Sequence, residues 1–183
     1  MTRPASVARD EPLRLFLALR IPGGVLDDIE RWQREQLSDV RIVPREHLHV
    51  TLAFLGRRPA GELESIVGAL REAAERAGEI RLTPFRYRET RSVGMLVLED
   101  ESDNAAQLAC DLQKRLEGLG VYRREGRPWL PHITVARWRE RPRLRPGAPP
   151  GRTFVPSDAA AYLSRLHPGG ARYEVLESVA LGG

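Results

Sequence analysis

Two short segments of the sequence repeat the pattern His-x-Thr. His49 and Thr51 belong to the segment His-Leu-His-Val-Thr-Leu-Ala-Phe-Leu-Gly, and His132 and Thr134 belong to the segment Pro-His-Ile-Thr-Val-Ala-Arg. Residues two apart on a β-strand share one face of the sheet. Each histidine is therefore expected to lie beside its threonine, while the apolar residues that alternate with them, Phe54 included, point to the core.

A pair of imidazoles with a pair of hydroxyls suits the hydrolysis of a phosphodiester. One imidazole removes a proton from the attacking water while the other protonates the departing alkoxide. The hydroxyls donate hydrogen bonds to the phosphate oxygens on which charge develops. A single His-x-Thr is a common strand pattern, so it is the second copy, again with an apolar opposite face, that favours a catalytic pair. This chemistry needs no metal and no cofactor, and we expect neither.

His47 is a third histidine close to the first motif. On a strand it shares a face with His49, and His-x-His is also a spacing found in metal ligands. No group of carboxylates accompanies these two histidines, and the second motif has no counterpart of His47. We therefore interpret His47 as a residue at the rim of the site, with metal binding as the less favoured alternative.

Other residues near the motifs are candidates for substrate binding. Phe16 lies on the face of the first expected strand that is not core, where it either stacks on a base or fills an interface. Arg137 is the cation that follows the second motif. Strict alternation places it on the face opposite His132, so either the strand twists or ends there, or Arg137 supports the structure. The segment from Arg139 to Arg152 is rich in Arg and Pro and predicts an exposed loop, which either contacts RNA phosphates or is simply solvated.

The elements that must position these residues follow from the hydrophobic spacing. Alternation predicts a strand over 13–21, and spacings of three and four predict helices near 25–37, 63–74 and 105–119. Further strands are expected at 40–43, 48–55, 80–87, 93–98, 133–138, 153–163 and 173–181. So many strands among few helices favour a mixed α+β fold with largely antiparallel strands.

Length and composition limit the class of protein. The chain has 183 residues and a formal net charge of +4, an excess too small to require nucleic acid by itself. Residues 1–183 have the length of a single domain, in which we expect residues 1–11 to be a flexible tail without the apolar core of a secretory signal. No apolar stretch is long enough to cross a membrane. Cys110, the one cysteine, is expected to be a packing residue, which fits a protein of the reducing cytoplasm.

The two motifs and their surroundings resemble the 2H phosphoesterase superfamily. Within it they resemble the bacterial and archaeal RNA 2′,3′-cyclic phosphodiesterases, also called 2′-5′ RNA ligases. The resemblance covers the residues 15–18, Val43-Pro44 with the first motif, 127–137, and 163–176. It implies a bilobal α+β fold with pseudo-two-fold symmetry, with largely antiparallel sheets, helices packed on their outer faces, and a site between the lobes.

The same resemblance implies a role for each motif residue. His49 is then the proton donor to the leaving ribose O3′, His132 the base that activates water, and Thr51 and Thr134 the phosphate-binding hydroxyls. The implied reaction opens the 2′,3′-cyclic phosphate of an RNA end or nucleotide to a 2′-phosphomonoester. We expect the protein to act as a monomer on such ends, away from membranes.

Two alternatives remain at this point. The same site can join RNA ends through a 2′-5′ bond, because a hydroxyl can replace the attacking water. The chain can also be a non-catalytic RNA- or nucleotide-binding module. Intact His and Thr in both motifs disfavour such a module, because Arg or Lys would bind phosphate better.

Overall fold

Strands outnumber helices in the computed structural model, which describes residues 12–182; the expected tail over residues 1–11 lies outside the described residues. The helices are α1 (Gly23–Gln36), α2 (Leu63–Glu75) and α3 (Asn104–Gly118), with 3-10 turns at Arg45–His47 (η1) and Ala60–Glu62 (η2). The strands are β1 (Pro12–Leu19), β2 (Arg41–Ile42), β3 (Val50–Pro59), β4 (Leu82–Glu89), β5 (Val93–Asp100), β6 (His132–Arg137), β7 (Ala159–His167) and β8 (Gly170–Val179).

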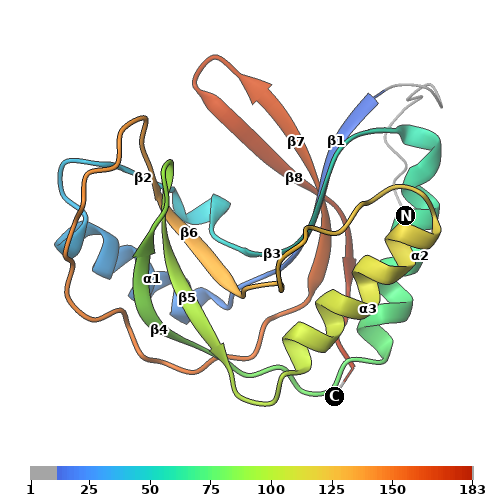
Figure 1. Ribbon diagram of the computed structural model, residues 1–183, viewed down its shortest axis with the longest axis horizontal. Helices are drawn as coiled ribbons and strands as arrows, with labels where there is room; N and C mark the ends of the chain where they lie inside the picture. The colour runs from blue at the N-terminus through green and yellow to red at the C-terminus, as the bar shows by residue number, and fades with distance from the viewer. Residues whose placement is uncertain (1–11, 183) are drawn as a thin grey trace.

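The strands form one antiparallel sheet with the order β4-β5-β6-β3-β1-β7-β8, and β2 pairs with β6. The sheet curls, and its helices cover the outer side: α1 lies behind β4 to β6, and α2 and α3 lie beside the other strands (Figure 1). The expected α+β fold with largely antiparallel strands and outer helices is confirmed. We call the opposite, concave side of the sheet the inner face.

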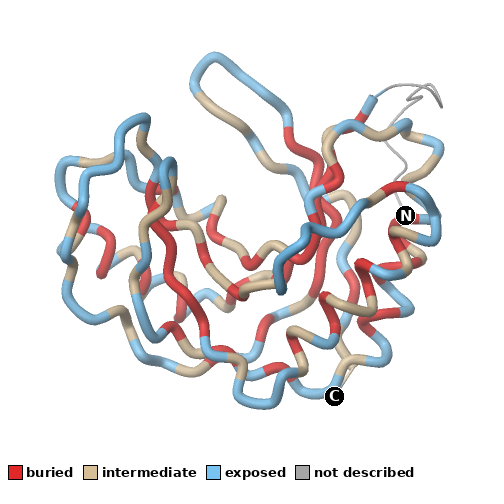
Figure 2. Tube along the Cα trace, in the orientation of Figure 1, coloured by how far each residue is buried: buried red, intermediate tan, exposed pale blue. Residues whose placement is uncertain are grey.

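The main hydrophobic core lies between the outer side of the sheet and the helices. It takes the alternate residues Leu15, Leu17 and Leu19 of β1, together with the helix residues spaced by three and four, such as Ile29 in α1. Figure 2 shows buried positions following the strands and the helix sides turned toward them. Burial of each Leu or Ile side chain contributes about 1.5–3 kcal/mol, so this core is what holds the curled sheet to its helices.

One expected strand differs from the observed one. The segment predicted to be extended over 153–163 is irregular at first, with a single bridge between Phe154 and Leu82, and β7 begins only at Ala159. β7 then continues to His167, the exposed last residue of the strand before the turn of the β7–β8 hairpin. The boundary moved because pairing with β1 starts at Ala159, opposite Leu19.

The two His-x-Thr strands meet at one backbone pair. Val50 of β3 pairs with Ile133 of β6 in antiparallel register, and both side chains are buried. Continuing this register by one residue on either side places each motif histidine opposite the threonine of the other motif. The pseudo-two-fold relation of the two motifs is therefore centred on this pair.

A β-bulge follows the threonine in each of these strands. In β3, Leu52 is an extra residue between the pairs Thr51–Ala18 and Ala53–Leu17. In β6, Val135 is an extra residue between the pairs that Thr134 and Ala136 make with β5. A bulge puts two residues opposite one, so the alternation of faces changes after it.

The bulges overturn two expectations that rest on strict alternation. Phe54, predicted to point to the core, lies on the inner face with 50% of its surface exposed. Arg137, predicted to lie on the face opposite His132, is exposed on the same face as His132. The placement of Phe54 in the core is wrong, and for Arg137 it is the strand that departs from alternation. Both follow from the extra residue in each strand, which shifts the following side chains by one position.

The helices of the described residues leave no candidate for a membrane span. None between residues 12 and 182 combines the length and apolar character that crossing a bilayer requires.

Candidate active site

The two motifs build two half-sites with the same sequence of burial. From Val50 to Phe54 and from Ile133 to Arg137, the residues are buried, partly buried, buried, buried and exposed. Histidine, threonine and the exposed residue thus occupy equivalent positions on the inner face of each strand. The structure therefore brings the two half-sites onto one face of the sheet, as the repeat predicts.

Both motif histidines are oriented by the same hydrogen bond. The Nδ1 of His49 lies 2.8 Å from the carbonyl oxygen of His47, and the Nδ1 of His132 lies 2.8 Å from that of Leu130. A carbonyl can only accept, so each Nδ1 must carry the proton. Proton exchange is then left to Nε2 in both imidazoles, which is the arrangement that an acid–base pair requires.

The imidazole of His49 is enclosed by neighbouring rings. The pKa of His49 is lowered from its ordinary value to about 4, chiefly by burial; the hydrogen bond to the His47 carbonyl opposes this shift, and the positive charges of His132 and Arg137 add to it. The free protein therefore holds His49 neutral at pH 7. In that state the Thr51 hydroxyl, 3.0 Å away, donates its hydrogen bond to Nε2 of His49.

Aromatic rings support His49 from β1 and the β7–β8 hairpin. Phe16 stacks parallel to Tyr162 at a centroid distance of 4.8 Å and lies 4.9 Å from the His49 ring. Tyr173 meets Phe16 edge-on at 4.8 Å. Phe16 is only 3% exposed, so of the two roles predicted for it the structure favours the filling of an interface. Its ring is covered by aromatic neighbours and offers little surface to a base.

Arg137 lies where its charge reaches the histidines. Its guanidinium lowers the pKa of both His49 and His47. The bulge at Val135 is what turns this side chain to the inner face. The candidate phosphate cation is thus placed beside the imidazoles, although the simple strand pattern predicts the opposite.

Two buried glutamines, which the sequence reasoning missed, hold the bulges. The Gln113 amide of α3 donates to the Leu52 carbonyl at 2.9 Å, and the Gln33 amide of α1 donates to the Val135 carbonyl at 2.8 Å. Each carbonyl belongs to the extra residue of its bulge, and the Val135 carbonyl also accepts a hydrogen bond from the Val43 amide. The sequence did contain a signal for Gln33: it lies four positions after the core residue Ile29, so it is a polar residue on the buried side of its helix.

His47 sits in the 3-10 turn before β3 and not on the strand itself. Its ring lies 4.3 Å from that of Tyr173, at the edge of the aromatic group. Burial lowers the pKa of His47 as well. Within residues 12–182, no three His, Cys, Asp or Glu side chains are arranged to hold a metal ion. The position of His47 agrees with a residue at the rim.

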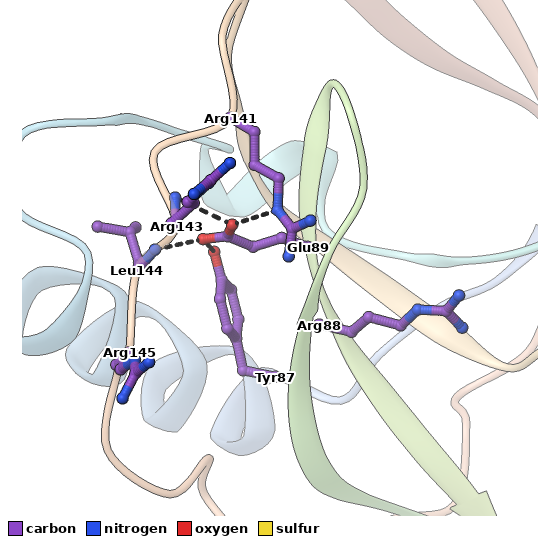
Figure 3. A pocket seen from close by; sticks show the side chains of 7 residues that line it. All are labelled: Tyr87, Arg88, Glu89, Arg141, Arg143, Leu144 and Arg145. Carbon is purple, nitrogen blue, oxygen red and sulfur yellow. Dashed lines mark hydrogen bonds and ion pairs between the residues drawn. The ribbon is translucent and has the colours of Figure 1, made fainter.

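The Arg-rich loop over 139–152 is irregular, as predicted, but it is anchored. Glu89 at the end of β4 is almost completely buried, and it accepts hydrogen bonds from the Arg141 guanidinium and from the Arg143 and Leu144 amides (Figure 3). Burial raises the pKa of Glu89, but these donors outweigh it and hold the pKa below its ordinary value. A hollow of about 570 Å³ lies here, away from the motif histidines, and Arg143 and Arg145 line it.

Trp129, in the segment before β6, and Cys110, on α3, have structural positions. The Trp129 indole donates to the Thr51 carbonyl at 3.0 Å, which ties the segment before β6 to β3. Cys110 lies partly buried on α3.

Comparison with known proteins identifies the family of this fold. The family model of the 2′-5′ RNA ligase superfamily matches residues 21–150. The chain is 30% identical to the RNA 2′,3′-cyclic phosphodiesterase of Escherichia coli, over 93% of this chain and 98% of that protein. It is 32% identical to the protein of the same name from Thermus thermophilus, over 93% and 91%. The crystal structure of Escherichia coli LigT with 3′-AMP superposes with a TM-score of 0.82 at 25% identity, covering 94% and 100% of the chains. A match over most of the chain, with this fold, shows that the protein belongs to the 2′-5′ RNA ligase superfamily.

Proposed function

We propose that the protein hydrolyses the 2′,3′-cyclic phosphate of an RNA end or nucleotide to a 2′-phosphomonoester. The observation that carries the proposal is the equivalent orientation of His49 and His132. Both have Nδ1 bonded to a backbone carbonyl, and both stand on the inner face on either side of one strand pair. The names of the relatives, RNA 2′,3′-cyclic phosphodiesterase, support the same substrate class.

In the proposed reaction, His132 Nε2 takes a proton from water as the water oxygen bonds to phosphorus. The bond between phosphorus and O3′ breaks, and His49 Nε2 donates its proton to O3′. The phosphate remains on O2′, and transfer of a proton between the imidazoles and solvent restores the site. Thr51, Thr134 and Arg137 donate to the phosphate oxygens on which charge grows.

The low pKa of His49 requires that this residue gain a proton with the substrate. A cyclic phosphate carries one negative charge, and its approach favours the charged imidazole. The Thr51 hydroxyl then leaves Nε2 and turns to the phosphate. An NMR titration of His49 in complex with a 2′-nucleotide tests this step. A raised pKa is expected, whereas a pKa that stays near 4 in the complex would assign His49 as the base and His132 as the acid.

Substitution of the histidines one at a time tests the catalytic pair. His49→Ala and His132→Ala should each lower the turnover of a 2′,3′-cyclic nucleotide by roughly 10² to 10⁴, with a much smaller change in substrate affinity. The double variant should lose far less than the product of the single losses, because the two groups act as one unit. His167→Ala, in the exposed hairpin, is the matched control. Near-full turnover in either single variant would refute the proposal.

Independence of metal is part of the proposal and has its own test. Two imidazoles already supply acid and base, so turnover should be unchanged in excess EDTA. A loss of turnover that zinc or manganese restores would instead make His47 a metal ligand.

The name of the superfamily favours a second candidate activity in the same site. If a 5′-hydroxyl of RNA replaces water, the same bond to O3′ breaks and a 2′-5′ phosphodiester forms. Incubation of a cyclic-phosphate end with a 5′-hydroxyl end tests this activity. Resistance of the new junction to a ribonuclease that cleaves only 3′-5′ phosphodiesters would identify the 2′-5′ product.

A further inference from the structure

The exposed residue of the first half-site, Phe54, is the equivalent of Arg137 in the second. Each lies five residues after its motif histidine and follows the bulge that turns it to the inner face. The pseudo-two-fold relation therefore places an aromatic ring on one side of the histidines where a cation stands on the other. Half of the Phe54 surface is exposed on the same face as the motif histidines, so its ring is accessible to a ligand bound there.

The residues around Phe54 provide cations on the same face. Phe54 pairs with Phe16 across the strands, and the next inner-face pair along them is Arg57 with Arg14. The Arg14 guanidinium lies 4.8 Å from the centre of the Phe54 ring, and it donates to the Ser164 hydroxyl at 2.8 Å. Within the described part of the chain, neither arginine forms an ion pair with a carboxylate, unlike Arg58 next to them, which binds Glu62.

A hollow opens at the same place. It has a volume of about 420 Å³, and Arg14, Arg57 and Ser164 lie among the residues of β1, β3 and β7 that line it. The hollow begins where the pairing of β1 with β7 ends, at Leu15 and Leu163. Leu15 is next to Phe16 in β1, and the Phe16 ring contacts His49. The hollow therefore lies next to the histidine site, further toward the beginning of β1.

We propose that Phe54, Arg14 and Arg57 form a subsite for the RNA strand on the 5′ side of the cyclic phosphate. Phe54 stacks on a base, and the two guanidinium groups bind an internucleotide phosphate. A stacking ring beside cations that track the backbone is how proteins bind single-stranded nucleic acid without reading its sequence. The subsite rests on the proposed function and deepens it: the preferred substrate is an oligonucleotide, because a cyclic mononucleotide has no internucleotide phosphate.

The test compares two substrates, 2′,3′-cyclic AMP and a tetranucleotide that ends in a 2′,3′-cyclic phosphate. In Arg57→Gln and Phe54→Ala, kcat/KM for the tetranucleotide should fall about tenfold relative to the wild type. For Arg57→Gln the loss should be much larger than the loss for the mononucleotide. The slope of log kcat/KM against log salt should become shallower by about 0.7 when one phosphate contact is removed. Phe54→Trp should retain most of the tetranucleotide activity.

The structure offers a matched control for Phe54. Phe85 of the edge strand β4 is 49% exposed, and the Arg86 guanidinium lies 5.3 Å from its ring. Phe85→Ala removes the same kind of ring from the far end of the sheet and should leave both substrates unaffected. The subsite would be overturned if Phe54→Ala and Arg57→Gln both kept the wild-type kcat/KM for the tetranucleotide and the wild-type salt slope.

A binding measurement separates this inference from the proposed function. Fluorescence anisotropy with a tetranucleotide ending in a 2′-phosphate reports affinity without turnover. Weaker binding by Arg57→Gln supports the subsite even if no cyclic phosphate is hydrolysed, a result that would refute the proposed function alone. If 2′,3′-cyclic AMP is hydrolysed but wild type and Arg57→Gln bind the tetranucleotide with equal affinity, the subsite is overturned and the proposed function stands.

Discussion

The lowered pKa of His49 makes the stability of the protein depend on pH in a predictable direction. The pKa is about 4 in the folded protein and about 6.5 in the unfolded chain. Between these values the unfolded chain binds more protons than the folded protein, so the free energy of unfolding decreases as the pH falls through this window. The contribution of His49 amounts to a loss of about 2 kcal/mol at pH 5 and about 3 kcal/mol below pH 4.

The perturbation that isolates this contribution is His49→Asn. An asparagine does not titrate, and its amide can take the place of Nδ1 as donor to the His47 carbonyl. Urea unfolding at pH 7 and pH 5 gives the loss of stability for each protein, and the comparison of losses removes any constant effect of the substitution. The wild type should lose about 2 kcal/mol more than His49→Asn over this interval. His167→Asn should lose as much as the wild type.

Two results would refute this reasoning. One is an equal loss of stability in wild type and His49→Asn between pH 7 and pH 5. The other is an imidazole of His49 that titrates near 6 or higher when followed directly by NMR in the free protein. Either would mean that the enclosure of His49 by the aromatic rings does not keep it neutral.

Other predictions concern the hydroxyls, the bulges and the loop. Thr134→Val should lower turnover by roughly 10- to 1000-fold with little change in thermal stability, because it removes a donor to the charge of the transition state; equal kinetics in wild type and variant would contradict this. Gln113→Leu should lower the free energy of unfolding by about 1–3 kcal/mol, because the Leu52 carbonyl loses its buried donor, and an unchanged urea midpoint would argue against a clamp. Replacing Arg143 and Arg145 with Gln should make RNA binding less dependent on salt if the loop contacts phosphates, and unchanged salt slopes would leave the loop a solvated segment.

Local patterns in the sequence were enough to predict most of the strands and helices and the pairing of each motif histidine with its threonine on one face. Alternation placed Leu15, Leu17 and Leu19 in the core, and the structure confirms them there. The repeated His-x-Thr indicated two half-sites, because residues two apart on a strand share a face whatever surrounds them. These features depend on neighbours along the chain, which the sequence shows directly.

The tertiary structure decided which side chains accompany the histidines. The bulges at Leu52 and Val135 arise from pairing with strands distant in sequence, so no local period reveals that they turn Phe54 and Arg137 to the inner face. The low pKa of His49 comes from its enclosure in the folded protein, where rings from β1 and the β7–β8 hairpin meet it. Such contacts exist only after the chain has folded, because they join segments that the sequence keeps far apart.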